Sequence, residues 1–201
     1  GASPEILVQS KQGKVTIRPI AGTRKRGINS SEDLLNKIDL IEDDKEKAEH
    51  MMLVDLARND LSKVSTVGSV NVDEMMIVEK YSHVMHMTSN VIGQKKDEST
   101  AIDCMKAALP AGTLSGAPKI RAMEILAEQE NRARGVYGGA VGYIGYNQTM
   151  DTAIVIRTAL HNDASVKVGV GAGIVYDSVG SSEWLETCLL YTSDAADEHS
   201  W

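Results

Sequence analysis

The order of strand and helix signals along the 201-residue chain predicts an α+β fold with a largely antiparallel sheet. Segments typical of strands occur in clusters, two near the start, two in the middle and three near the end. They do not alternate one by one with helices, as they would in a parallel sheet. Turn residues at Asn147-Gln148 and Asn162-Asp163 separate the last three strands and indicate direct hairpin connections.

The first half of the chain contains four expected strands and two expected helices. Residues 6–20 predict two short strands around the turn KQGK at 11–14. A helix is expected to begin with Ser30 as its N-cap, and a longer helix covers residues 43–61. Residues 70–93 predict two strands. In the second, Val84, His86, Thr88 and Asn90 share one face because side chains alternate.

The second half predicts two helices, three strands and a last helix. The helices cover residues 98–109 and 115–130, with Pro118 in the first turn of the second. The strands are GGAVGYIGY (138–146), DTAIVIRTALH (151–161) and SVKVGVGAGIVYD (165–177). The last helix opens at Ser181-Ser182.

Composition narrows the class of protein. Hydrophobic residues make up 42% and charged residues 24%, which is ordinary for a soluble globular protein. The net charge of −7 argues against nucleic acid as a partner, and the basic clusters at 11–14 and 24–30 are expected to be solvated loops. No apolar run is long enough for a membrane helix, and no signal segment precedes the first strand. Two cysteines, Cys104 and Cys188, give no disulfide framework, so we expect a cytoplasmic protein.

Three long motifs occur in a fixed order. RPIAGTRKRG (18–27) and LPAGTLSGAPKIRAMEIL (109–126) each place a threonine in a glycine-containing turn, where backbone N–H groups can approach an anion. Between them lies the helical segment AEHMMLVDLARNDL (48–61). The chain resembles the chorismate-binding enzymes in these three motifs. The resemblance implies a helix-flanked β-sandwich, of which this chain would be roughly the C-terminal half.

The two ends of the chain carry separate expectations. In the family, SPEILV lies well inside the catalytic domain, so residues 1–187 are expected to be the C-terminal part of that domain without its front portion. Residues 188–201, CLLYTSDAADEHSW, resemble a translated sequencing adapter and are expected to be a non-native tail. A genuine acidic, disordered tail is the alternative.

The long helix carries candidate metal ligands. Glu46 and Glu49 are three residues apart and share one face, which by itself is usually a solvated face. The resemblance implies that Glu49 binds Mg²⁺ together with Glu186 of the last helix, with Glu46 and Glu183 as an outer ring. Mg²⁺ prefers such oxygen ligands.

His86 and Thr113 are the candidate catalytic residues. A lone strand histidine is more often structural, but the resemblance implies that His86 handles a proton or stabilises charge on the departing C4 hydroxyl. Thr113 either starts an ordinary helix or binds a carboxylate through its hydroxyl and nearby N–H groups. Lys119 is expected to be a surface helix lysine, and DLARND (55–60) an internal salt-bridge network without a catalytic role.

Three further residues are candidate substrate ligands. Arg157 stands in an apolar segment, where a guanidinium requires an anionic partner, either a structural ion pair or a ligand. The resemblance implies that Tyr137, Arg157 and Gly173 contact substrate carboxylates or the enolpyruvyl group.

The segment Ala21-Gly22-Thr23, also expected to bind substrate, distinguishes branches of the family. Relatives that make aminodeoxychorismate usually carry a nucleophilic lysine at the position of Ala21, and isochorismate and salicylate synthases use a lysine elsewhere. Ala21 leaves direct attack of ammonia on C2, the pattern of the anthranilate synthases of tryptophan biosynthesis, in which a glutamine amidotransferase subunit supplies ammonia. An aminodeoxychorismate synthase component I or another chorismate-utilising enzyme is the alternative.

A different class of interpretation is a non-catalytic fragment. Half of a sandwich would expose an unpaired strand edge and an apolar face. On this basis, the isolated chain is expected to fold poorly or aggregate and to be inactive.

Overall fold

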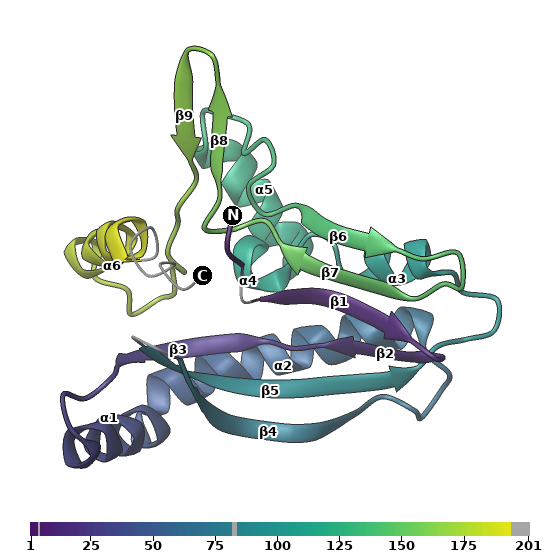
Figure 1. The fold of residues 1–201 in the computed structure, drawn as a ribbon, viewed down its shortest axis with the longest axis horizontal. Coiled ribbons are helices and arrows are strands. Elements are labelled where there is room, and N and C mark those ends of the chain that lie inside the picture. Colours follow the sequence, from purple (N-terminus) through teal and green to yellow (C-terminus); the bar gives the residue numbers. More distant parts are fainter. Residues whose placement is uncertain (4, 82–83, 194–201) are drawn as a thin grey trace.

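The computed structural model describes residues 1–3, 5–81 and 84–193, and the side chains of 186 and 189–193 lie outside that description. Strands and helices follow one another in clusters (Figure 1). The strands are β1 Ile6–Lys11, β2 Lys14–Ile17, β3 Ile20–Lys25, β4 Asn71–Lys80, β5 Val84–Gln94, β6 Ala140–Ile144, β7 Met150–Ile154, β8 Ala159–Asn162 and β9 Ser165–Val168. The helices are α1 Ser30–Glu42, α2 Asp44–Val64, α3 Ala101–Ala108, α4 Gly112–Ser115, α5 Lys119–Gln129 and α6 Gly180–Ser193.

Seven strands form one antiparallel sheet, and β8 and β9 form a separate hairpin. The long strand β5 pairs with both β2 and β3 along one edge and with β4 along the other. β1 pairs with β2 and β7, and β7 pairs with β6. The predicted α+β class with antiparallel strands is therefore confirmed.

The sheet opens at Arg18-Pro19, between β2 and β3. Proline has no N–H to donate to a neighbouring strand, which favours such an interruption. Beyond it, β3 stays paired with β5, while β1 pairs with β7. The two parts of the sheet diverge toward the end of the molecule that also holds α6 (Figure 1).

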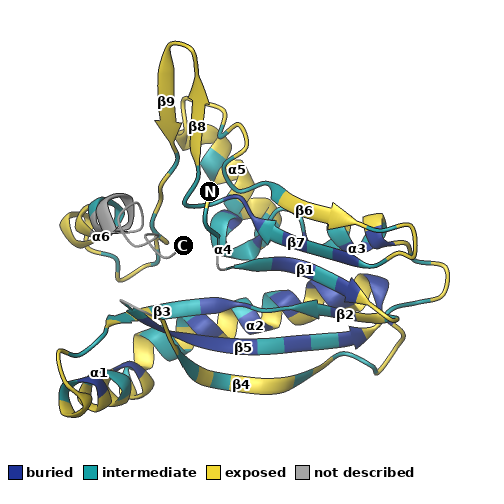
Figure 2. Ribbon diagram, in the orientation of Figure 1, coloured by how far each residue is buried: buried dark blue, intermediate teal, exposed yellow. Residues whose placement is uncertain are grey.

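The main core lies between the sheet and helices α2 and α3. Val54 and Leu61 of α2 are 1% exposed, and Val8 and Val91 of the sheet are fully buried. Figure 2 shows that β1, β5 and α2 are buried over parts of their length. Cys104 of α3 is also buried in this cluster, as expected of a structural cysteine.

Two local expectations near the start of the chain need correction. Asn29, not Ser30, caps α1, because its side chain accepts hydrogen bonds from the N–H groups of Ser31 and Glu32. The segment 18–27 is not simply a turn. Its middle forms β3, whose glycine at 22 lies in a bulge with φ +76°.

The predicted helix 115–130 begins later than expected, because the short helix α4 ends at Ser115 and α5 covers Lys119–Gln129. Gly116 ends the single turn α4 with φ +93°, and its N–H donates to the Gly112 carbonyl. The helix then restarts after Pro118, which occupies the N-cap of α5. A proline ring is compatible with a helix start but clashes with the preceding turn in an interior, which explains the break.

The predicted strands 151–161 and 165–177 are also shorter than expected. β7 ends at Ile154, and Arg157 has φ +50°, so it lies in a turn and not in a strand. The chain then forms the hairpin β8–β9, where the Asn162 side chain accepts hydrogen bonds from the N–H groups of Ala164 and Ser165. Residues after Val168 form no further strand before α6.

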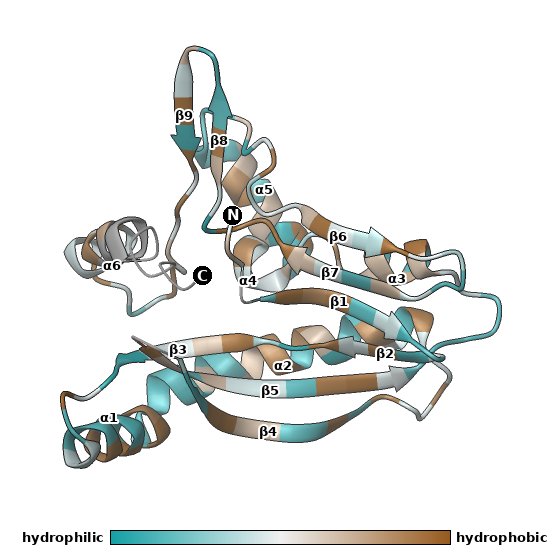
Figure 3. Ribbon diagram, in the orientation of Figure 1, coloured by the Kyte–Doolittle hydropathy of each residue, from teal (hydrophilic) through white to brown (hydrophobic). Residues whose placement is uncertain are grey.

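Apolar side chains are exposed on two outer elements. Val141 and Tyr143 of β6 are 56% and 61% exposed, and β6 pairs only with β7 in the part of the chain that is described. Leu34 and Leu35 of α1 are 55% and 65% exposed, on a helix where hydrophobic and hydrophilic residues alternate (Figure 3). Within the described residues, no helix has the length and apolarity to cross a membrane.

Candidate functional site

His86 lies in the central strand, where its ring is held by β3 and by Tyr81. Its Nδ1 atom is 3.2 Å from the Gly22 carbonyl oxygen and 3.1 Å from the Thr23 hydroxyl. The Tyr81 ring contacts the imidazole edge-on, with centroids 5.6 Å apart. His86 is 6% exposed, so its orientation is fixed by protein groups.

The segment Ala21-Gly22-Thr23 lies beside His86. This proximity is needed if the segment and the histidine are to contact the same substrate. In the β3–β5 register, Ala21 is opposite Met87 and Thr23 is opposite His86, with the bulge between them. Ala21 therefore occupies the strand next to the histidine and carries no nucleophile.

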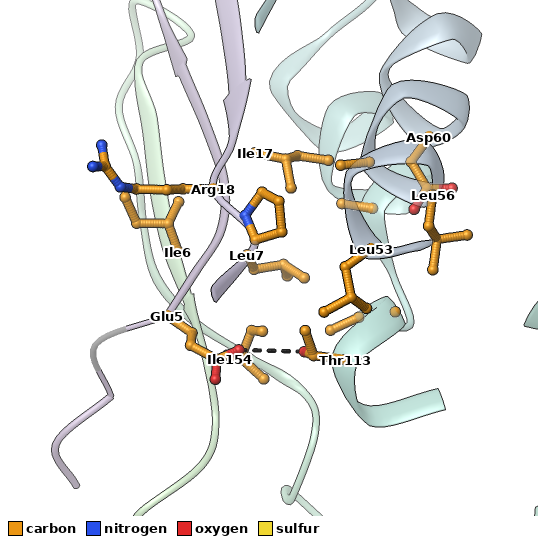
Figure 4. A pocket seen from close by; sticks show the side chains of 15 residues that line it. Glu5, Ile6, Leu7, Ile17, Arg18, Leu53, Leu56, Asp60, Thr113 and Ile154 are labelled. Atoms are coloured by element: carbon orange, nitrogen blue, oxygen red, sulfur yellow. Dashed lines mark hydrogen bonds between the residues drawn. The ribbon is translucent and has the colours of Figure 1, made fainter. Parts of the chain in front are cut away.

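Thr113 contacts a carboxylate of the chain itself. Its hydroxyl donates to Glu5 Oε2 at 3.3 Å, across the small space between α4 and the start of β1 (Figure 4). Burial raises the pKa of the Glu5 carboxyl, while the Thr113 hydrogen bond and the charge of Arg157 lower it. Arg157 thus lies within electrostatic reach of Glu5, and these three residues form one group.

Sequence reasoning did not identify Glu5. It is an acid directly before an apolar strand, the same signal that singled out Arg157. Next to it lies a cavity of about 40 Å³, room for little more than one water molecule. Most of its lining is apolar, including Leu53, Leu56 and Ile154.

Tyr137 lies under the segment that follows β9. A Cβ atom on Gly169 would be 2.7 Å from the tyrosine ring, and one on Gly171 would be 3.1 Å from its hydroxyl. Burial raises the pKa of Tyr137; the Arg134 guanidinium, 5.9 Å from the ring centroid, opposes that shift. Gly173 follows in an open position, since a Cβ there would have no atom within 4 Å.

The candidate metal ligands lie at the start of α2. Burial raises the pKa of Glu49, Lys45 lowers it, and the charges of Glu46 and Glu183 raise it again. The structure therefore brings Glu183 of α6 within electrostatic reach of Glu49. Glu186 was predicted as the second ligand, and its side chain lies outside the described ones.

The described residues alone do not assemble a metal site. No three His, Cys, Asp or Glu side chains in the described part of the chain are grouped as metal ligands would be. Glu46 instead accepts a hydrogen bond from Arg24 Nη1 at 3.0 Å. The same guanidinium binds Asp39 at 2.6 Å and Asp43 at 2.8 Å, joining β3 to α1 and α2. Glu49 lies 3.7 Å from its basic partner Lys45, a longer distance than those between Arg24 and its three carboxylates.

Lys119 is not the surface lysine that the sequence suggested. Its ammonium donates to Asp60 Oδ2 at 2.7 Å, and the two side chains are only 14% and 5% exposed. Lys63 contacts the other oxygen of Asp60 at 2.8 Å. The interpretation of DLARND as part of an internal salt-bridge network is confirmed for Asp60.

The sequence profile of chorismate binding enzymes matches residues 1–192. The chain belongs to this family.

Two curated relatives in the family carry the same name. The chain is 58% identical over 187 residues to anthranilate synthase component 1 of Pseudomonas aeruginosa and 55% identical over 187 residues to that of Aquifex aeolicus. Each match covers 93% of this chain but only 38% of the relative. The chain thus spans less than two fifths of the length of these relatives.

Solved structures of the family share the fold. Anthranilate synthase component I from Streptococcus pneumoniae matches with a TM-score of 0.88 and 49% identity, over 96% of this chain and 42% of that one. A putative 2,3-dihydroxybenzoate-specific isochorismate synthase from Bacillus anthracis matches with a TM-score of 0.86 and 26% identity, over 96% and 52%. The α+β fold with mostly antiparallel sheets is therefore that of the chorismate-binding enzymes.

Proposed function

We propose that this chain is the chorismate-converting part of an anthranilate synthase component I, an enzyme of tryptophan biosynthesis that forms anthranilate and pyruvate from chorismate and ammonia. Membership of the chorismate-binding enzymes supports the substrate class. The names of the relatives at 55–58% identity support the branch. Ala21 is the observation that carries the choice of reaction. It lies in β3 beside the strand of His86 and provides no amine, so the nucleophile does not come from this position, which favours direct attack by ammonia.

In the proposed site, Arg157 and Tyr137 hold the anionic ends of chorismate, and the backbone near Gly173 completes that side. The turn carrying Thr113 adds a hydroxyl. The Arg157 guanidinium supplies positive charge beside Glu5, which suits a dianionic substrate. Holding both ends of the substrate fixes C2 and C4 relative to His86, which reduces the entropic part of the barrier.

Two groups suit the proton transfers. Burial raises the pKa of the Glu5 carboxyl, which favours its protonated form and makes it a candidate proton donor to the C4 hydroxyl as this group departs. His86 is proposed to handle the proton that is released when pyruvate is lost and the ring becomes aromatic.

We also propose that Glu49 and Glu186 hold Mg²⁺, with Glu46 and Glu183 around them. The mutual repulsion of Glu46, Glu49 and Glu183 supports this, because a divalent cation among them would offset it. When bound, the ion would supply positive charge to a substrate carboxylate. Oxygen-only donors are those that Mg²⁺ prefers.

The proposed source of ammonia is a glutamine amidotransferase subunit, and the proposed location is the cytoplasm. The name "component 1" of the relatives supports a partner component.

The test is product analysis with the chain extended at both ends to the length of its relatives. The protein is incubated with chorismate, Mg²⁺ and ammonium, and the products are separated by chromatography. Anthranilate with an equal amount of pyruvate, abolished by EDTA, is the expected result. Aminodeoxychorismate, isochorismate or salicylate would overturn the argument from Ala21, and no conversion would favour a non-catalytic chain. Ala21→Lys is the sharpest variant, since it is expected to introduce aminodeoxychorismate formation.

A further inference from the structure

The DLARND motif of α2 ends beside the turn that carries Thr113. Lys119, the first residue of α5, donates to Asp60 Oδ2 at 2.7 Å. The same ammonium lies 3.4 Å from the carbonyl oxygen of Ala108, the last residue of α3. Residues 109–118 connect α3 to α5 and contain the short helix α4. Both ends of this connection are therefore held at one point of α2.

The middle of the connection rests on α2 one helical turn earlier. Gly112 lies so close to Leu56 that a Cβ atom on the glycine would collide with the leucine side chain. Leu56 and Asp60 are four residues apart, so they lie on the same face of α2, next to Thr113 (Figure 4). Thr113 directly follows Gly112 in the chain. Its place is therefore set by the packing of its neighbour on α2 and by the ion pair that holds the two ends.

The other contacts of this turn do not attach it to α2. Hydrogen bonds within residues 111–116 close the turn on itself. Arg134 donates to the Leu114 carbonyl at 2.7 Å, which joins the turn to the segment after α5. The hydrogen bond from Thr113 to Glu5 is 3.3 Å long and holds the side chain only weakly. The contacts with α2 thus carry most of the attachment.

A buried ion pair adds direction more than stability. The side chains of Lys119 and Asp60 are 14% and 5% exposed, and the desolvation of two charges offsets much of their attraction. Apolar side chains of similar volume often hold two helices together equally well. A short hydrogen bond between charged groups, by contrast, fixes the distance and angle between its partners. This property suits a role in placing the turn.

We propose that Asp60 and Lys119 are positioning residues that place Thr113 for contact with a substrate carboxylate. Thr113 and Glu5 line the same small cavity as Asp60, so a shift of the turn would change this side of the site. The inference rests on the proposed function, since it explains how one of the proposed substrate contacts is held. It gives the DLARND motif a role that acts through Thr113.

The first test is hydrogen exchange of the full-length protein without substrate. The reporting amides are those of Leu114, Ser115 and Gly116, whose N–H groups donate within the turn. Lys119→Met is expected to speed their exchange about tenfold and to leave the amides of β5 unchanged. Unchanged exchange in the turn would overturn the proposal even if the protein makes anthranilate, so this failure differs from a failure of the proposed function.

The second test separates placement from stability. Asp60→Asn/Lys119→Met removes both charges and is expected to be nearly as stable as the wild type. It should still raise the KM for chorismate about tenfold with kcat nearly unchanged, because the Thr113 hydroxyl no longer meets the substrate carboxylate well. KM is read from the consumption of chorismate, whatever the product. A double variant with the KM of the wild type would contradict the proposal.

Lys63→Met is the matched control for the second test. Lys63 contacts the other oxygen of Asp60 at 2.8 Å, but it lies on α2 itself and not on the connection that carries the turn. Its loss removes a charge beside Asp60 and is expected to leave KM unchanged. A KM raised as much as in the double variant would show a general effect of charge and contradict the proposal.

The third test asks whether the ion pair acts through Thr113. Thr113→Val removes the hydroxyl, keeps the branched shape and is expected to raise KM by itself. Adding Asp60→Asn/Lys119→Met to this variant should raise KM no further, because the contact to be placed is already absent. Effects on KM that multiply would show that the pair acts elsewhere in the site and would overturn the proposal.

Discussion

The strands that carry His86 and the strands that follow Arg157 differ sharply in packing. We call β1, β2, β5 and β7 with α2 and α3 the packed body, and residues 155–193 the outer segment. In the packed body, β5 is buried over most of its length. In the outer segment, every residue of β8 and β9 is exposed, and the hairpin projects away from the sheet (Figure 2).

This difference divides the candidate site into two halves. His86, Glu49 and Thr113 are attached to the packed body, whose helices and sheet hold one another in place. Arg157, Gly173 and Glu183 belong to the outer segment, which has few buried side chains. The packed body can therefore fix its half of the site alone. The outer half depends more on bound substrate and on further contacts.

The largest difference in unfolding free energy is expected between two leucine-to-alanine variants, one in each region. Leu61→Ala in α2 removes a side chain that is 1% exposed and should cost about 2–5 kcal/mol of unfolding free energy. Leu160→Ala in β8 truncates a side chain that is 44% exposed and should cost less than about 0.5 kcal/mol. Urea unfolding measures both. Equal losses would contradict the division into a packed body and an outer segment.

Lys119→Met tests a charge pair that joins α5 to the packed body. It leaves the carboxylate of Asp60 buried with Lys63 alone and should cost about 2–3 kcal/mol. The double variant Asp60→Asn/Lys119→Met should recover most of that loss. Lys106→Met is the matched control, because Lys106 is an exposed lysine 3.9 Å from Asp103, and it should change stability by less than about 0.5 kcal/mol. A loss for Lys119→Met no larger than for this control would show that the Asp60 pair does not hold α5 to α2.

Gly22→Ala and Gly68→Ala compare two glycines of similar backbone conformation. Gly68 has φ +80° with open space around it, so alanine there should cost about 1 kcal/mol from the backbone alone. Gly22→Ala should cost about 2 kcal/mol, because its Cβ would also meet Leu40 and Glu46. Thermal unfolding of both variants separates the two contributions. Equal costs would mean that the bulge does not pack against α1 and α2.

Glu5→Gln is expected to have the smallest effect on stability, with a sign that depends on pH. The folded pKa of Glu5 is raised above its ordinary value of 4.5, so the native state binds the proton more tightly than the unfolded state. Wild-type stability is therefore lost as pH rises through the folded pKa. The variant should be slightly more stable than wild type at pH 7, a difference that vanishes at about pH 4. A variant that is less stable at pH 7 would contradict the burial of this charge.

Much of the packed body follows from periodicity and turn residues. The helix 43–61 and the two strands within 70–93 were predicted because their apolar residues recur regularly, and α2, β4 and β5 occupy these positions. The break after Ile154 was not predictable in this way, because apolar residues continue through Val155 and Ile156. The break between α4 and α5 does have a local signal in Gly116 and Pro118, which the predicted helix start at residue 115 did not take into account.

The site was predictable to a different degree. Motifs indicated His86, Thr113 and the segment 21–23, and the structure places Thr23 beside His86. The partners of Glu5 and Lys119 could not be found from sequence, because these contacts join residues that are 108 and 59 positions apart. Long-range pairs of this kind leave no local pattern.

Hydrogen exchange of the full-length protein, with chorismate and Mg²⁺ but without ammonium, tests most directly whether the two regions share one substrate site. Joint protection of amides in 20–25, 84–90 and 169–173, with the same dependence on chorismate concentration, is the result expected here. Protection of only one region, or of neither, would contradict a single chorismate site built across the packed body and the outer segment.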